Sequence, residues 1–479
     1  MAHPSNPDFH IKEPGTRASS SDLWFFSYLP WSLYNGLSTP LIPLLAIALY
    51  HSDSPLIIAA VVAASTLTEV PFTIFWGNIS DRIRHRKYFV VLSFLATGIV
   101  LIAMPFAPNL NDFLLLNVLE GICSSASTPI GTVLLLETRR KQWWARDVGV
   151  FGLVSGLGTA AGLALGGLWL TGAATLDAQV FNVVFAMQFL VLLSGALAFV
   201  SGLTANAWIE EPETYLDRDE VEADIRIHRG VIERIRGFRK RVLNVLDLAK
   251  GEEIPLTFME WLLFISLLLE SFGSQTFYGT FIYYLTAASG AALGQNMVFF
   301  VFLASAVAST ALFYHSGIAV ERYSPKYIFI ESLLARAFLI PVFLFAGVYF
   351  AGDSSHMAIV MMGLNGAMGL LFAFSSTAST LFLLRLMRGS ENKGKALGIY
   401  NAVVGFGGLA GTIFGGWIYS TYNSTIAYLV ATGIIVVGAV LLLPIPLRMT
   451  PYRHRHMPMK PVETPAKQPA KPTLRPWEV

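Results

Sequence analysis

The chain has 479 residues, of which 54% are hydrophobic and only 13% are charged. A soluble domain carries about a quarter of its residues as charged side chains, so this composition excludes a water-soluble globule and indicates an integral membrane protein. The formal net charge of +2 gives no sign of a nucleic-acid partner. A single cysteine, Cys123, excludes a disulfide framework and a cysteine-ligated metal site.

Residues 1–22 are polar and lack the apolar core of a signal peptide, so the first apolar segment is expected to remain as a helix. About 20 apolar residues in helical form cross a bilayer core. The sequence therefore predicts an all-α integral membrane protein with twelve transmembrane helices. They are expected at 23–50, 56–79, 88–106, 112–137, 146–171, 179–204, 256–286, 292–317, 326–350, 356–384, 395–420 and 424–446.

The positive charges alternate along the chain. Of the 33 lysines and arginines, all but one lie in the termini or in the connections that follow the even-numbered segments. Because positively charged connections stay in the cytoplasm, we expect both termini to be cytoplasmic and the protein to reside in the plasma membrane. The exception is Arg336, which lies inside the ninth segment.

The charged segment 205–255 separates six helices from six and sets the expected domains. Its apolar residues recur every three or four positions, which predicts an amphipathic helix at the membrane surface; a simple tether is the alternative. The tail is rich in Pro and Lys, which predicts disorder. The expected divisions are an N-terminal tail (1–22), two six-helix bundles (23–204 and 256–447), the linker between them (205–255) and a C-terminal tail (448–479).

The two halves carry the same glycine pattern. Gly156, Gly158 and Gly162 recur at an offset of 249 residues as Gly405, Gly407 and Gly411. A second pattern, Gly77-x3-Asp81-Arg82, recurs at an offset of 240 as Gly317-x3-Glu321-Arg322. Parallel repeats of this kind are a known transporter plan, in which the halves are related by an axis along the membrane normal.

Residues 77–87 resemble the loop 2–3 signature of the major facilitator superfamily, Gly-x-x-x-Asp-Arg-x-Gly-Arg-Arg/Lys. Arg84 stands in place of the second glycine, and His85 in place of the next basic residue. Residues 317–326 resemble the weaker copy that this family carries in loop 8–9. The resemblance covers 23–447 and implies two pseudo-symmetric bundles of six helices.

The same motif predicts a conformational gate. Gly77 permits close approach of the second helix to a neighbour, and a carboxylate at the helix end is stabilised by the positive N-terminal end of another helix. The resemblance implies that this neighbour is the eleventh helix. The alternative is that these charges only set topology. The gate residues expected on this basis are Gly77, Asp81, Arg82, Arg86, Glu137, Gly317, Glu321 and Arg322.

The fifth segment is similar to the antiporter motif of drug–proton exchangers, but Leu157 stands where that motif has proline. In the fourth segment, Asn117 stands where the family's antiporters carry arginine. These departures do not favour drug–proton antiport. Packing of small residues alone is the other interpretation of the glycine ladder.

Ionisable residues inside a bilayer are costly and indicate function by default. Glu69, Glu120, Glu270 and Arg336 are the four, and Glu270 is our first choice for a substrate or proton site. The resemblance implies that helices 1, 4, 7 and 10 line the cavity. For each of these residues the alternative is a structural pairing. For Arg336 the resemblance itself implies this alternative, because helix 9 is peripheral in this family. Further candidates on cavity helices are Tyr34, Asn35, Tyr278 and Asn365.

These observations favour a secondary transporter working by alternating access, with a proton-coupled exporter of amphipathic or drug-like compounds as the leading hypothesis. An importer or facilitator of sugars or organic anions is the same-fold rival, and Arg336 favours an anion if it faces the cavity. A non-transporting sensor or scaffold is the rival from another class. No nucleotide loop, zinc-spaced histidines or nucleophile elbow is present, so we expect neither an enzyme nor a cofactor or metal. The expected partners are a small solute, protons and the lipid bilayer, with the protein a monomer.

Overall fold

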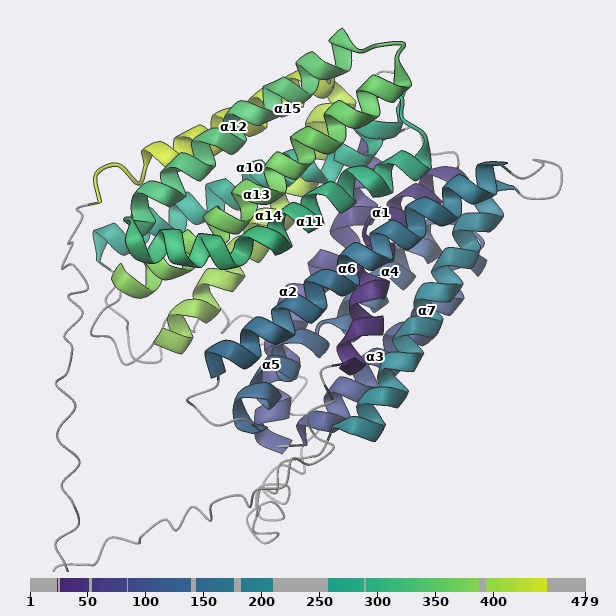
Figure 1. The fold of residues 1–479 in the computed structure, drawn as a ribbon, viewed down its shortest axis with the longest axis horizontal. Coiled ribbons are helices and arrows are strands. Elements are labelled where there is room, and N and C mark those ends of the chain that lie inside the picture. Colours follow the sequence, from purple (N-terminus) through teal and green to yellow (C-terminus); the bar gives the residue numbers. More distant parts are fainter. Residues whose placement is uncertain are drawn as a thin grey trace, which may run out of the picture. The chain divides into compact units, whose positions relative to one another are not determined.

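The computed structural model of the chain describes Trp24 and residues 26–50, 54–83, 85–138, 144–175, 182–209, 257–287, 290–386 and 393–445, and its regular elements there are all helical (Figure 1). Both predicted tails and nearly all of the 205–255 linker, with its predicted amphipathic helix, lie outside these ranges. The described helices begin and end within a few residues of the predicted segments, apart from one break.

The N-terminal half begins with a long helix and contains a short 3-10 turn after its third helix. Its helices are α1 (Tyr28–Tyr50), α2 (Pro55–Ile83), α3 (Arg86–Ala103) with η2 (Met104–Phe106), α4 (Leu110–Ser124), α5 (Ser127–Thr138), α6 (Trp144–Thr175) and α7 (Val183–Trp208).

The C-terminal half has one helix for each predicted segment. They are α10 (Phe258–Thr286), α11 (Gln295–Arg322), α12 (Pro325–Tyr349), α13 (Ser354–Leu386), α14 (Lys393–Thr421) and α15 (Ser424–Val440). Side-chain caps explain several starts, since Asn423 caps α15 and Thr257 forms a capping box with Glu260 at α10. Ten spans of the described part are long and apolar enough to cross a bilayer, and α15 is a shorter apolar helix.

The predicted segment 112–137 corresponds to one candidate membrane span, Leu110–Leu135, but its helix is interrupted at Ser125 and Ala126, between α4 and α5. Pro129 lies in the first turn of α5, and because proline has no backbone N–H, a continuous helix would lose the hydrogen bond from residue 129 to the carbonyl of Ser125. Carbonyls near the break are satisfied by neighbouring side chains: the Trp76 indole donates to Ile122 O at 3.0 Å, and the Ser93 hydroxyl to Cys123 O at 2.6 Å.

The two halves repeat one packing pattern. In the first half α1 packs on α6, α2 on α4 and α3 on α7, and in the second α10 packs on α14, α11 on α13 and α12 on α15. Figure 1 shows the purple-to-teal helices and the green-to-yellow helices as two groups. A Cβ placed on Gly162 would lie 2.2 Å from Leu33 O, and one on Gly411 would lie 2.1 Å from Phe272 O. The glycine ladders therefore permit equivalent close approaches in each half.

The halves meet through α6 on α11 and α14 on α2. We call the end of the helices that bears the arginine- and lysine-rich connections the basic end. Gly156 lies against Thr310, and its repeat partner Gly405 lies against Val70. Nearer the opposite end, the Asn296 amide donates to the Thr171 hydroxyl at 3.0 Å, which joins α11 to α6.

Four of the described glycines toward the basic end have no described neighbour beside them. A Cβ on any of the four would meet no described atom within 4 Å; they are Gly77, Gly152, Gly317 and Gly398. Among the described residues, the helices of the two halves are therefore in contact at their middle and toward the opposite end, whereas no described atom of the other half lies within 4 Å of a Cβ at these four positions. Gly77 has no described neighbour within this distance, and its predicted approach to the eleventh helix stays a prediction.

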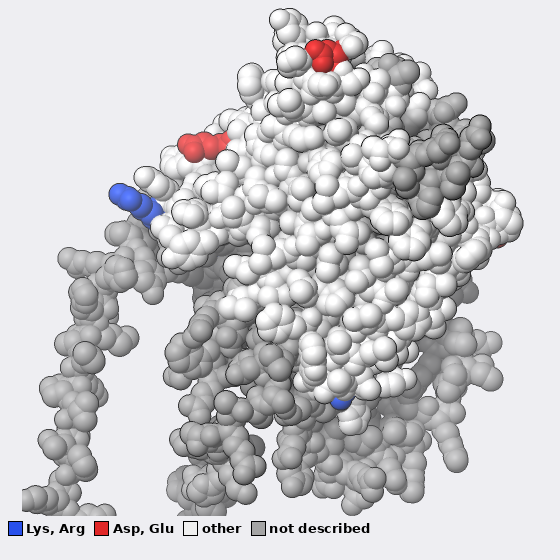
Figure 2. Space-filling model, turned by 45° about the vertical axis from the view of Figure 1, so that its right-hand side comes forward, with Lys and Arg blue, Asp and Glu red and all other residues white. Residues whose placement is uncertain are grey.

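The outer surface of the helices is apolar. Leu115, Phe185, Phe338 and Phe345 each expose more than half of their surface. On the face drawn in Figure 2, the described surface carries charged side chains only near its margins. This distribution fits contact with hydrocarbon over the middle of the molecule.

Candidate functional site

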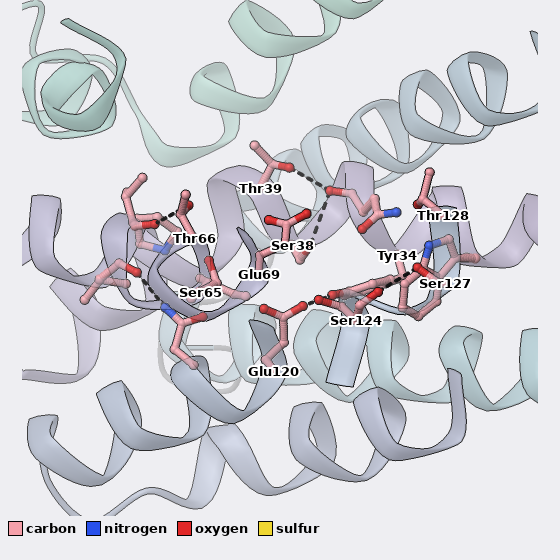
Figure 3. Close-up of a pocket in the computed structure, with 17 residues that line it drawn as sticks. Tyr34, Ser38, Thr39, Ser65, Thr66, Glu69, Glu120, Ser124, Ser127 and Thr128 are labelled. Carbon is pink, nitrogen blue, oxygen red and sulfur yellow. Dashed lines mark hydrogen bonds between the residues drawn. The ribbon is translucent and has the colours of Figure 1, made fainter. Parts of the chain in front are cut away.

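A cavity of about 310 Å³ lies in the N-terminal half, among α1, α2, α4 and α5 (Figure 3). Its lining is rich in hydroxyl and amide groups and includes two carboxylates. The lining residues are Trp31, Tyr34, Asn35, Ser38, Thr39, Ile42, Pro43, Val61, Val62, Ser65, Thr66, Glu69, Asn117, Glu120, Ser124, Ser127 and Thr128. None of these is a lysine, arginine or histidine, so the described lining is acidic and contains no basic side chain.

Glu120 is the more enclosed of the two carboxylates. It is 6% exposed on α4, and the hydroxyl of Tyr34 on α1 donates a hydrogen bond to its Oε1. Tyr34 is itself 1% exposed. This contact fixes the direction of the Glu120 side chain and ties α4 to α1 at the depth of the cavity.

Glu69 on α2 is the more open carboxylate. Its side chain is exposed, and Figure 3 draws it at the same cavity as Glu120. Within the described part of the chain, no hydrogen bond or ion pair to the Glu69 carboxylate is made. Glu69 is therefore the acid that is available to a solute in the cavity.

Polar contacts hold α2 and α4 together beside this cavity. The buried Asn117 amide donates to Val61 O at 2.6 Å, and the Thr68 hydroxyl donates to Val118 O at 2.9 Å. A Cβ on Gly121 would lie 2.3 Å from Ser65 O, so the two backbones are close. These contacts fix the relative positions of the helices that carry Glu69 and Glu120.

A second polar cluster lies in the C-terminal half. Arg336 on α12 contacts Glu270 on α10, with 2.6 Å between Nη1 and Oε1. The Arg336 Nη2 group also donates to the Ser274 hydroxyl at 2.9 Å, and that hydroxyl lies 3.3 Å from Glu270 Oε1. Arg336 is 3% exposed. Its charge is balanced inside the bundle, and it is not part of the cavity lining.

Tyr278 and Asn365, predicted on cavity helices, contact each other in the C-terminal half and are not among the residues that line the cavity described above. The Tyr278 hydroxyl donates to Asn365 Oδ1 at 3.2 Å, and the Asn365 amide donates to Val301 O at 2.9 Å. Asn365 thus ties α13 to α11 as Asn117 ties α4 to α2. This role was not predicted from the sequence, although the pattern Asn-x3-Gly occurs at both Asn117 and Asn365 and was a usable signal.

The predicted gate residues are only partly visible. The side chains of Asp81, Arg82, Glu137 and Glu321 lie outside the described part. The Arg86 guanidinium donates to the Ser80 hydroxyl at 3.3 Å, and Arg322 is exposed, with its Cζ 5.8 Å from the centroid of the Tyr323 ring. The described residues contain no group of three or more His, Cys, Asp or Glu side chains that could hold a metal ion.

Comparisons with known proteins match this architecture. The family model of the Major Facilitator Superfamily matches residues 24–390 and 263–478. No curated protein matches the sequence. Three solved structures share the fold at low sequence identity. They are a D-xylose–proton symporter (13% identity, 89% of this chain and 98% of that chain, TM-score 0.66), the xylose transporter XylE from E. coli in an inward-open conformation (13%, 89% and 96%, 0.63) and the nucleoside transporter NupG (14%, 89% and 98%, 0.62).

Proposed function

The chain belongs to the major facilitator superfamily of membrane transporters, and from this premise we propose that it is a proton-coupled secondary transporter that exports small amphipathic solutes by alternating access. The observation that carries the proposal is the acidic cavity of the N-terminal half. It holds Glu69 and Glu120 and no basic side chain among its described lining residues.

The physical argument concerns uncompensated charge. Two ionised carboxylates in one membrane-embedded cavity repel each other, and each is costly to hold away from water. A proton or a cationic solute relieves this cost. Either the proton or the cationic solute balances the charge of the site, so the site can exchange one for the other. This exchange is the requirement for coupling solute movement to a proton gradient.

Glu270 serves a different role in this proposal. Its charge is balanced by Arg336 at 2.6 Å, so it has less need of a proton than the cavity acids have. We therefore place proton coupling on Glu69 and Glu120, with Tyr34 and Asn35 in the solute site. Glu270, Arg336, Tyr278 and Asn365 hold the facing half in position. Because Arg336 lies outside the cavity lining, it gives no support to an anionic solute.

The orientation and the gate complete the proposal. Following the distribution of positive charge, we place the basic end and both termini on the cytoplasmic side of the plasma membrane. The conformation described here is then open toward the cytoplasm. When the basic end closes, Gly77 and Asp81 of α2 would approach the start of α14, and their repeat partners Gly317 and Glu321 of α11 would approach α6.

A second candidate is import of a neutral polyhydroxylated solute together with a proton. It is supported by the polar lining, in which Ser38, Thr39, Ser65 and Thr66 offer hydroxyl groups. It is also consistent with the likeness in fold to a D-xylose–proton symporter. The same two carboxylates would then carry the proton in the direction of the solute.

Flux in proteoliposomes tests both candidates. A solute selected by a thermal-shift screen is supplied outside vesicles whose interior is either more acidic or more alkaline than the medium. Exchange predicts uptake driven by an acidic interior, and co-transport predicts uptake driven by an acidic exterior. Glu69→Gln should abolish the gradient-driven part, and Glu120→Gln should reduce it.

Glu331→Gln is the matched control, because Glu331 is an exposed acid of α12 that does not line the cavity. It should transport as the unmodified protein does. Flux that ignores the proton gradient, or that survives in both cavity variants, would show that the proposed coupling is wrong.

A further inference from the structure

We propose that Glu69 is the contact residue for the positively charged nitrogen of a small organic cation, and that this cation replaces a proton on Glu69. The inference rests on the proposed proton-coupled transport and adds to it the chemical class of the solute. The proton leaves the Glu69 carboxyl group for water as the cation arrives, so the charge of the site is the same before and after the exchange.

The argument begins with the unequal surroundings of the acids in the described helices. Glu120 accepts a hydrogen bond from Tyr34, Glu270 pairs with Arg336, and Glu260 completes a helix cap. Glu69 is the cavity acid to which no described side chain or backbone group bonds, and it is exposed where these three are not. An exposed carboxylate inside a membrane protein needs a partner, and a solute in the cavity is the partner within reach.

The rest of the lining selects for a cation over an anion or a large ligand. Glu120 adds a second negative group and no basic side chain opposes it among the described lining residues, so an anion would meet only repulsion. Trp31 and Tyr34 contribute aromatic rings, which attract cations. A volume of about 310 Å³ is at the lower end of ligand pockets, which span roughly 300–1,000 Å³, so the solute is expected to be compact.

The position of Glu69 is set by the protein and not by the solute. Asn117, Thr68 and Gly121 hold α2 against α4, so the spacing between the two acids is determined before a solute arrives. A preformed site loses less free energy to ordering on binding than a flexible one does. Titratable groups on the helices packed against α2 include Tyr34 on α1, Glu120 and Cys123 on α4, Glu270 on α10, whose charge Arg336 balances, and Tyr400 on α14. Of these, Tyr34 and Glu120 line the cavity together with Glu69.

The test uses 1-methyl-4-phenylpyridinium, whose charge does not change with pH. Its binding to the purified full-length protein is measured by calorimetry in two buffers with different heats of ionisation, which counts the protons released. We expect release of one proton per cation bound. We also expect the affinity for the cation to fall about tenfold for each unit by which the pH is lowered, over the range in which Glu69 holds its proton in the free protein.

Neutral 4-phenylpyridine at pH 8 is the ligand control, since it has nearly the same shape without the charge, and it should bind at least tenfold more weakly. Glu69→Gln should lose both tight binding and proton release, whereas Glu69→Asp should keep proton release. Glu120→Gln should weaken binding and still release a proton. Glu331→Gln should match the unmodified protein, and melting temperatures establish that each variant is folded.

Three results would overturn the inference. They are equal affinity for the neutral and charged probes, unchanged binding in Glu69→Gln, or tighter binding of sodium ions alone than of the organic cation. Failure of the proposed function looks different. If the cation binds through Glu69 but a proton gradient drives no flux in vesicles, the transport proposal is wrong and the cation site stands. If a gradient drives flux of another solute while the cation does not bind, the cation site is wrong and the transport proposal stands.

Discussion

Arg336 and Glu270 are two charged side chains that neutralise each other inside the C-terminal half, with 2.6 Å between Nη1 and Oε1. Removing one partner of a buried pair leaves an uncompensated charge, which typically costs about 3–5 kcal/mol. We expect Arg336→Gln to lower the melting temperature of the detergent-solubilised protein sharply. The double variant Arg336→Gln with Glu270→Gln should recover most of the loss, because no charge is then left buried.

The double variant is what makes this prediction specific. If Arg336 only filled space, the loss would persist when Glu270 is also replaced. Equal melting temperatures for the single and double variants would therefore contradict a charge-pairing role.

The sequence singled out the ionisable residues inside the apolar segments but not their partners. Glu69, Glu120, Glu270 and Arg336 stand out because each interrupts an apolar segment. That Glu270 pairs with Arg336 depends on how α10 and α12 pack, since 66 residues separate them in the chain. For the same reason, our choice of Glu270 over Glu69 as the first candidate did not take account of Arg336, because the linear sequence does not show which residue lies beside Glu270.

At the scale of helices, the glycines divide into those in contact and those beside open space. A Cβ on Gly121 would lie 2.3 Å from Ser65 O, and one on its repeat partner Gly369 would lie 2.3 Å from Ser305 O. Both neighbours are backbone atoms, which cannot move aside without shifting a helix. We expect Gly121→Ala and Gly369→Ala to lower the melting temperature by similar amounts.

Gly77→Ala is the matched variant at a glycine with open space, and it separates stability from transport. Alanine is favoured over glycine inside a helix by roughly 0.5–1 kcal/mol, so the melting temperature should stay the same or rise. Flux in proteoliposomes should nevertheless fall, because closure of the basic end brings Gly77 toward α14. A variant that melts normally and transports normally would show that Gly77 is not part of the gate.

Element boundaries were predictable where local chemistry sets them. Apolar length fixed the twelve segments, and the caps at Asn109, Thr257 and Asn423 fall where the first turns begin. The break between α4 and α5 was missed. Pro129 was a signal for it, but proline is tolerated inside membrane helices such as α1, which contains Pro40 and Pro43 without ending. Whether a proline breaks a helix depends on neighbours such as Trp76, which the pattern does not reveal.

At the scale of the whole transporter, contacts between the halves at the end opposite the basic end must separate in each cycle. The Asn296 amide and the Thr171 hydroxyl, 3.0 Å apart, mark one such contact between α11 and α6. In a Cys123→Ser background, we expect Asn296→Cys with Thr171→Cys, joined by a short thiol-cleavable cross-linker, to stop transport. A reductant should restore it.

Binding of a cavity ligand should survive the cross-link, because this end is already closed in the conformation described here. Each single-cysteine variant treated with the same reagent is the control. Transport at the normal rate by fully cross-linked protein would show that these helices do not separate during the cycle.

The fold was the most predictable feature of the molecule, because it depends on sums over many residues. Twelve apolar segments and a repeat at offsets of 240 and 249 residues predict two bundles of six helices, and the packing pairs of the two halves correspond. The conformational state was not predictable. Open and closed forms share nearly all of the contacts within each bundle. They differ in the contacts between the bundles, where the same residues must permit both conformations.

The two glycine crossings between the halves have a mechanical consequence. Gly156 on Thr310 and Gly405 on Val70 are repeat partners, so they define the two ends of an axle that passes through the middle of the protein. The helix α2 extends on both sides of this axle. At about 1.5 Å of rise per residue, its short arm, from Val70 to Gly77, is about 10 Å long, and its long arm, from Val70 to Ala59, is about 16 Å long. A tilt about this axle that closes the short arm must open the long one, and because neither glycine has a side chain to interlock with Thr310 or Val70, the two helices at each crossing can turn past one another.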